Sequence, residues 1–247
     1  MVSGFSIFTC MVRLLALETS TAACSVALAQ GDDINEQYVV APQDHTSRLL
    51  PMIDELLSQH HLQLRDIDAI AFAGGPGSFT GLRICLGIVQ GLAFGADLPV
   101  IKLSTLAVMA NGASRLFECA EGTVIVPALD ARMDEVYWGA YQVQQHGLRQ
   151  LLPGAVNDPA DLQHLLTALG LNGPTIGVGN GWICGPFASE QPTFVTKIIS
   201  EFYPHAWDVA QLGLQQYQLK GGENVLEVAP TYIRNEVRWK KRQRIRT

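Results

Sequence analysis

The segment 73–95 holds the residues whose types and spacing come nearest to a chemical motif. Gly74, Gly75 and Gly77 follow a short apolar run and precede a helical stretch. A glycine loop between a strand and a helix N-terminus can bind phosphate through backbone N–H groups. However, the spacing does not fit GxGxxG, and no Lys-Ser/Thr pair follows as in a P-loop. The favoured interpretation is a tight turn that lets the helix pack closely, and phosphate binding is the alternative.

Two carboxylates could serve a nucleotide-binding site. Glu18 and Asp130 each end a predicted strand, which is where an actin-type ATPase places acidic residues for magnesium. The loop after Glu18, residues 19–21, lacks the glycines expected of a first phosphate loop. No GxSxG motif supports a serine hydrolase. Intrinsic nucleotide hydrolysis is therefore not the favoured function.

Metal ligation finds little support in the histidines and cysteines. The six histidines form no HxxxH pair, and His60 and His61 are adjacent, so they point to different faces of a helix. The five cysteines include no CxxC pair, which indicates reduced thiols and a cytoplasmic chain. We expect surface histidines and no intrinsic cofactor.

The helix after the glycine loop carries an unusual stripe of small residues. Gly87, Gly91 and Gly95 fall four residues apart, beside Ile84 and Ile88. Each glycine inside a helix costs about 1 kcal/mol relative to alanine. Close approach of another helix would offset that cost. Periodicity alone leaves open whether that helix belongs to this chain or to another subunit.

The periodic pattern predicts an α/β protein built from two similar halves. Residues 16–18 and 128–130 (Ala-Leu-Glu and Ala-Leu-Asp) form a weak repeat at an offset of 112 residues, and the order of elements after them partly repeats. Strands are predicted at 13–17, 22–29, 36–40, 68–73, 99–102, 124–129, 135–143 and 174–178, and helices at 46–60, 78–95, 104–112, 158–169 and 204–219. Pro204 is predicted in the first turn of the last helix.

Residues 75–83, Gly-Pro-Gly-Ser-Phe-Thr-Gly-Leu-Arg, resemble the signature of the TsaB family. That family is related to the TsaD/glycoprotease-like proteins of the actin/Hsp70/sugar-kinase superfold. Further similar blocks lie at 14–28, 45–57, 104–106, 130–137 and 230–235, so the resemblance runs from Arg13 to about Lys241. Two positions depart from the family pattern, Glu18 in place of Asp and Cys85 in place of Gly. The first makes a metal–phosphate role at that carboxylate less expected.

The resemblance implies a two-lobed actin-like (RNase H-like, duplicated) fold with a reduced second lobe. We divide the chain into an N-terminal extension at 1–10, a first lobe at 11–112 (βββαβαβα), a second lobe at 113–232 and a basic tail at 233–247. Met11 is a plausible alternative start. No run reaches about 18 uninterrupted apolar residues, so no membrane span is expected.

The implied function is that of a non-catalytic partner subunit. TsaD would transfer the threonylcarbamoyl group to the adenosine beside the anticodon of tRNAs reading A-starting codons, and this chain would dimerise with TsaD and activate or stabilise it. The ATPase TsaE would join them, with ATP and metal on the partners, and the chain alone would form a homodimer. The alternative is a stand-alone ATP-dependent kinase or a glycoprotease-type metallopeptidase. The candidate interface is the helix 46–60 together with Gly81, Arg83, Ile84, Gly87, Ile88, Gly91 and Gly95.

The C-terminal tail concentrates positive charge in a chain of net charge −6. The last fourteen residues hold seven of the seventeen Lys and Arg residues. A solvated tail is the plain interpretation. Contact with tRNA phosphates within the complex is the functional hypothesis. The candidate contacts are Arg238, Lys240, Lys241, Arg242 and Arg244.

Overall fold

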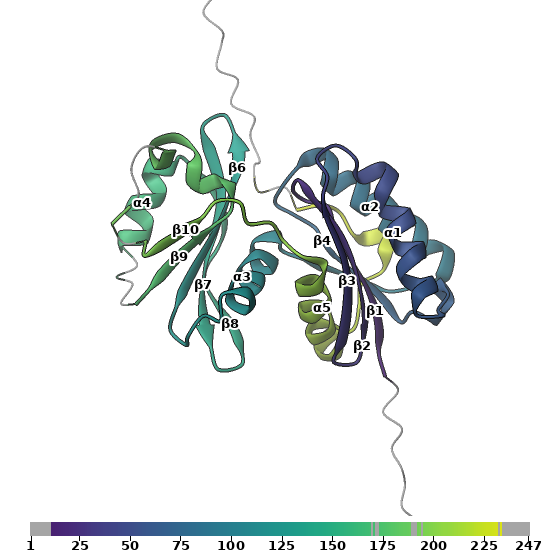
Figure 1. Cartoon of the computed structure of the whole chain (residues 1–247). Coiled ribbons are helices and arrows are strands. Elements are labelled where there is room, and N and C mark those ends of the chain that lie inside the picture. Colours follow the sequence, from purple (N-terminus) through teal and green to yellow (C-terminus); the bar gives the residue numbers. More distant parts are fainter. Residues whose placement is uncertain are drawn as a thin grey trace, which may run out of the picture.

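Two five-stranded sheets, one in each of two lobes, organise the molecule (Figure 1). The computed structural model describes residues 11–168, 170, 173–188, 192–193, 195–231 and 233. The predicted extension at 1–10 and the five candidate tRNA contacts in the tail lie outside the described residues.

The first sheet begins with the meander that the sequence predicts. Strands β1 (Arg13–Glu18), β2 (Ala23–Gln30) and β3 (Asp33–Val40) pair antiparallel, and β4 (Ala69–Ala73) and β5 (Val100–Leu103) then add in parallel. The order is β3-β2-β1-β4-β5. Strands β1 and β4 are nearly continuous apolar runs because helices cover both of their faces.

Helices α1 (His45–Gln59) and α2 (Phe79–Ala96) cover one face of this sheet. Leu49 and Ile53 of α1 and Val89 of α2 pack against side chains that alternate along the strands. Ser78 is the N-cap of α2, and its Oγ accepts a hydrogen bond from the Gly81 N–H at 3.3 Å. The predicted start of this helix is thereby confirmed.

The second sheet repeats the topology of the first. Strands β6 (Val124–Arg132), β7 (Glu135–Gln144) and β8 (Gly147–Asn157) form a meander, and β9 (Thr175–Val178) and β10 (Lys197–Ile199) continue in parallel, in the order β10-β9-β6-β7-β8. Helix α4 (Pro159–Ala168) joins β8 to β9. Short 3₁₀ turns stand between β9 and β10, where the first lobe has α2. The predicted duplicated fold with a reduced second lobe is confirmed.

The two remaining helices cross between the lobes. Helix α3 (Thr105–Leu116) follows β5, yet Met109 and Ala113 pack on the second sheet. Helix α5 (Ala206–Lys220) follows β10, yet Ala206 and Val209 pack on the first sheet. A division by chain order at residue 112 therefore does not describe which helix covers which sheet.

Several predicted boundaries need correction. Strands β8 and β10 were not predicted. Pro204 lies before the N-cap residue His205 rather than in the first turn of α5, so the predicted start of that helix was wrong. The 3₁₀ turns Leu64–Asp66 and Val225–Glu227 were also not predicted, and both pack beside α2.

Candidate interaction surface and central cleft

The glycine stripe of α2 lies on the surface of the described fold. Gly87, Gly91 and Gly95 are exposed. A Cβ atom placed on any of the three would meet no atom within 4 Å among the described residues. Packing against another helix of the same chain, one of the two alternatives, is therefore not observed in that part of the molecule.

The side chains beside the stripe combine apolar surface with one cation. Arg83 is exposed, and its guanidinium carbon lies 3.6 Å from the centroid of the Phe79 ring. Ile84 and Ile88 are half-buried. Phe94 is 70% exposed and was missed by the sequence prediction. It follows Gly91 by three residues, so helical spacing places it on the same face and could have identified it.

Gly81 has a different role from the other predicted interface glycines. It is buried, and a Cβ atom there would lie 2.0 Å from the carbonyl oxygen of Thr19. The Thr19 hydroxyl donates a hydrogen bond to the Gly81 carbonyl at 2.9 Å. Gly81 therefore permits close approach of α2 to the turn after β1 and is not part of the exposed surface of α2. Its predicted role at a partner interface stays a prediction.

Helix α2 is strongly apolar in composition, although only a minor part of it is buried. By length and composition alone it is long and apolar enough to cross a membrane, and 28% of that window is buried. Such a signal is weak for a single helix, because helices packed in folded proteins give it too. Here α2 lies beside α1, whose Leu50 is 48% exposed (Figure 1). We call the exposed surface of α1 and α2 that includes Leu50, Arg83, Gly87, Gly91 and Phe94 the α1–α2 face.

A central cleft of about 760 Å³ adjoins the N-terminal end of this face. The first lobe supplies residues of the turn after β1, the start of α1 and the start of α2, including Ser20, Phe79 and Ile84. The second lobe supplies Asp130 and Tyr137, among others. Because Ile84 belongs both to the cleft wall and to the predicted interface, the two surfaces are continuous.

The two candidate carboxylates differ sharply in environment. Glu18 is fully buried; its Oε1 accepts a hydrogen bond from the Ser20 N–H, and Oε2 has no partner among the residues that the structure describes. Burial raises the pKa of Glu18 from its ordinary value of 4.5 to about 7, outweighing the hydrogen bond from the Ser20 N–H, which lowers it. Asp130 is partly exposed and pairs with Arg132 at 3.2 Å. Among the described residues, no three His, Cys, Asp or Glu side chains gather in a way that could hold a metal ion.

The duplicated sheets, crossing helices and central cleft define a class of two-lobed α/β protein. Within that class, the family model of TsaD, tRNA N6-adenosine threonylcarbamoyltransferase, matches residues 34–180, more than half of the chain.

Full-length relatives narrow the assignment. The TsaB protein of Escherichia coli is 39% identical over 93% of this chain and 98% of its own length. The TsaB protein of Haemophilus influenzae is 41% identical over 93% of this chain and 97% of its own length. The solved structure of YeaZ from Pseudomonas aeruginosa, at 39% identity, covers 90% of this chain and 100% of that chain with a TM-score of 0.78. The chain belongs to the TsaB family, which confirms the resemblance.

Proposed function

We propose that this chain acts in the biosynthesis of threonylcarbamoyladenosine in tRNA, as a non-catalytic subunit that binds a TsaD protein through the α1–α2 face. The names of its relatives support the pathway. The open glycine stripe carries the proposal for the surface, since three exposed glycines on one helix allow close helix approach.

The likeness of the chain to TsaD supports this choice of partner. A TsaD family model matches residues 34–180, a range that includes α1 and α2, so a TsaD protein would offer helices of related geometry. Phe94 and Leu50 would supply apolar contact around the glycines, and Arg83 would supply a polar contact at one end. Another copy of this chain would offer the same helices, which supports a homodimer of the isolated chain.

The chemistry would then reside in the partners. TsaD would transfer the threonylcarbamoyl group to the adenosine beside the anticodon in tRNAs reading A-starting codons, TsaE would join as the ATPase, and ATP and metal would bind on those proteins. This chain would stabilise or activate TsaD in the cytoplasm. ATP turnover and metal content of the purified chain test the alternative of a stand-alone kinase or metallopeptidase, and significant turnover would favour that alternative.

The first test is a Gly91→Leu substitution. A Cβ atom at Gly91 meets nothing within 4 Å in the described structure, so the free chain should fold normally. A leucine there would hold the partner helix away, and we expect loss of the heterodimer. Light scattering with TsaD from the same organism measures the association, and circular dichroism checks the fold.

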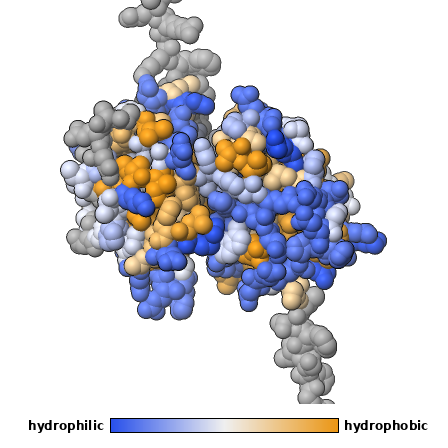
Figure 2. Space-filling model, in the orientation of Figure 1, coloured by the Kyte–Doolittle hydropathy of each residue, from blue (hydrophilic) through white to orange (hydrophobic). Residues whose placement is uncertain are grey.

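Two matched variants identify the surface. Gln218→Leu adds the same side chain at an exposed position of α5 and should leave binding unchanged. Figure 2 shows hydrophobic side chains gathered over the second lobe, where the exposed apolar residues include Leu165 and Ile183. Ile183→Ser should also leave binding unchanged. Tight binding by Gly91→Leu, together with loss in Ile183→Ser, would move the interface to the second lobe and contradict the proposal.

A further inference from the structure

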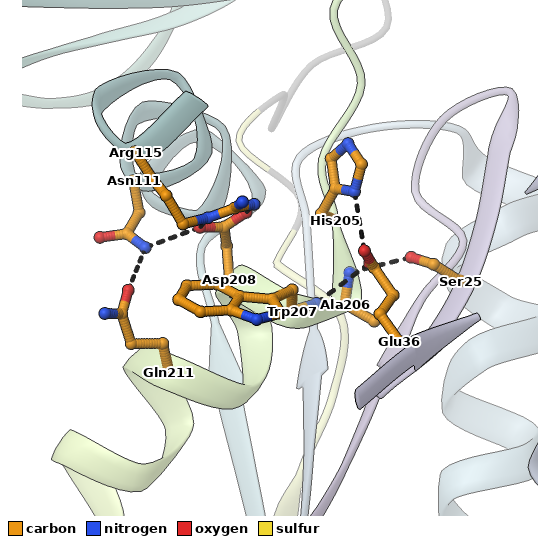
Figure 3. A network of polar contacts seen from close by, with 9 residues as sticks. All are labelled: Ser25, Glu36, Asn111, Arg115, His205, Ala206, Trp207, Asp208 and Gln211. Atoms are coloured by element: carbon orange, nitrogen blue, oxygen red, sulfur yellow. Dashed lines mark hydrogen bonds and ion pairs between the residues drawn. The ribbon is translucent and has the colours of Figure 1, made fainter. Parts of the chain in front are cut away.

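The first turn of α5 is fastened to the first sheet by hydrogen bonds from its own backbone. The Ala206 N–H donates to Ser25 Oγ at 2.9 Å, and the Trp207 N–H donates to Glu36 Oε1 at 3.1 Å (Figure 3). His205 Nδ1 lies 3.0 Å from Glu36 Oε2, and its ring stacks on Tyr38. These contacts satisfy N–H groups that every helix leaves open at its start. The N-terminus of α5 is thereby fixed to β2 and β3.

The next residue along α5 binds the helix that belongs to the other sheet. The Asp208 side chain is fully buried and accepts hydrogen bonds from Arg115 Nε at 3.1 Å and Nη2 at 2.7 Å (Figure 3). It also accepts one from Asn111 Nδ2 at 2.8 Å. Trp207 lies under the Arg115 guanidinium, with 4.2 Å between its ring centroid and the guanidinium carbon. A bidentate arginine–carboxylate pair fixes orientation as well as distance.

Gly112 shows how closely α3 and α5 approach at this point. A Cβ atom at Gly112 would lie 2.8 Å from Asp208 Oδ2. Gly112 is an interior residue of α3, where glycine is unfavourable relative to alanine. The space it leaves is occupied by the carboxylate, so the sequence of α3 is adapted to this contact.

Consecutive residues of one helix thus bind opposite lobes. Trp207 is held by β3 of the first sheet, and Asp208 is held by α3, which packs on the second sheet. Contacts between apolar helix surfaces alone permit small sliding movements. The buried Asp208 carboxylate accepts hydrogen bonds from two nitrogens of Arg115 and one of Asn111. This arrangement has a single favourable geometry, since any displacement leaves the buried charge unpaired.

We propose that the Asp208–Arg115–Asn111 junction is a rigid link that holds the two lobes at one angle. These residues thereby set the width of the central cleft. The inference is independent of the function proposed above, because the α1–α2 face lies within one lobe.

Measuring the distance between the two lobes tests whether this junction is rigid. Spin labels at Asp32→Cys, in the exposed turn after β2, and Gln145→Cys, in the exposed turn after β7, report the lobe angle by pulsed electron double resonance. Cys10, Cys119 and Cys184 are first replaced by serine so that they do not take up the label. Cys24 and Cys85 are kept, because they are buried. Labelled chain is diluted into unlabelled chain so that only intramolecular distances contribute. We expect one narrow distance distribution in the parent and a broader, shifted distribution in Arg115→Gln.

Arg48→Gln is the matched control, because Arg48 forms an exposed ion pair with Asp44 within one lobe. Its distance distribution should equal that of the parent.

Hydrogen exchange provides a second measure, and the first turn of α5 should lose protection by about tenfold or more in Arg115→Gln. If that variant does not fold, Asn111→Ala, which keeps the ion pair, is measured in the same way. A distance distribution that matches the parent in the folded variant would overturn the proposal.

Discussion

Glu18 shows how one buried side chain can make stability depend on pH. Its carboxyl group ends β1, is removed from solvent and has one oxygen that no group in the described part of the chain pairs. The pKa of about 7 in the folded chain lies above the ordinary value of 4.5, so the folded chain binds the proton more tightly than the unfolded chain. Stability is therefore gained as pH falls from about 7 towards 4.5 and lost as pH rises through that window.

Replacing Glu18 with glutamine should remove this dependence. Above pH 7 the variant should be more stable than the parent by on the order of 2–3 kcal/mol, because the neutral amide avoids burial of a charge. At pH 5 the difference should fall below about 1 kcal/mol. Urea unfolding at pH 5 and at pH 8 measures this difference in the free energy of unfolding. Equal differences at pH 5 and pH 8 would contradict the pKa assignment. The sequence located this carboxylate at a strand end, but its burial comes from packing that the local pattern does not show.

Helix α2 contains glycines with two opposite functions. Gly87 is open to solvent, so Gly87→Ala should stabilise the monomeric chain by about 1 kcal/mol through helix propensity. Gly81 approaches the Thr19 carbonyl, so Gly81→Ala should destabilise it by about 1–3 kcal/mol through steric overlap. Denaturant unfolding, at concentrations where the chain is monomeric, compares the two variants. Stabilisation by Gly81→Ala would show that α2 can move away from that turn at little cost.

The elements that were predicted well have strong local periodicity. Helices α1 and α2 and the strands of the first meander fall within a few residues of their predicted ranges. Strand β8 was missed because Pro153 and Gly154 interrupt its pattern, and an edge strand tolerates both. Strand β10 has three residues, too few for any periodicity. The exposed glycine stripe was found from spacing, whereas the burial of Gly81 results from its contact with Thr19, which is distant in the sequence.

At the scale of the molecule, the positive charge of the C-terminal tail predicts that the tail would contribute to tRNA binding by the complex. The basic tail lies outside the described residues, and its contact with tRNA remains a hypothesis. Deleting residues 240–247 should weaken tRNA binding by the assembled complex and flatten its dependence on salt, because each lost phosphate contact lowers the slope by about 0.9. Filter binding between about 50 and 200 mM salt measures the slope. A slope unchanged by the deletion would exclude the tail from the contact.

The lobes themselves were predictable as a repeat, whereas the exchange of helices between them was not. An apolar stripe on α5 indicates that the helix is covered, but gives no information on which sheet covers it. Residues 204–219 were accordingly assigned to the second lobe by chain order. The contacts of Ala206 and Val209 with β1 and β4 place the helix on the first sheet instead.

The crossing of α3 and α5 also governs how the chain can fold as it is synthesised. Leu14 and Ala16 emerge first from the ribosome, but the helix that buries them extends to Lys220. Until that helix emerges, one face of the first sheet has no cover, and exposed apolar surface on a nascent chain favours aggregation. A fragment that ends after β10 would keep strands β1 to β10 and still leave that face open. The first lobe therefore cannot be completed before the last helix has been made, although it begins the chain.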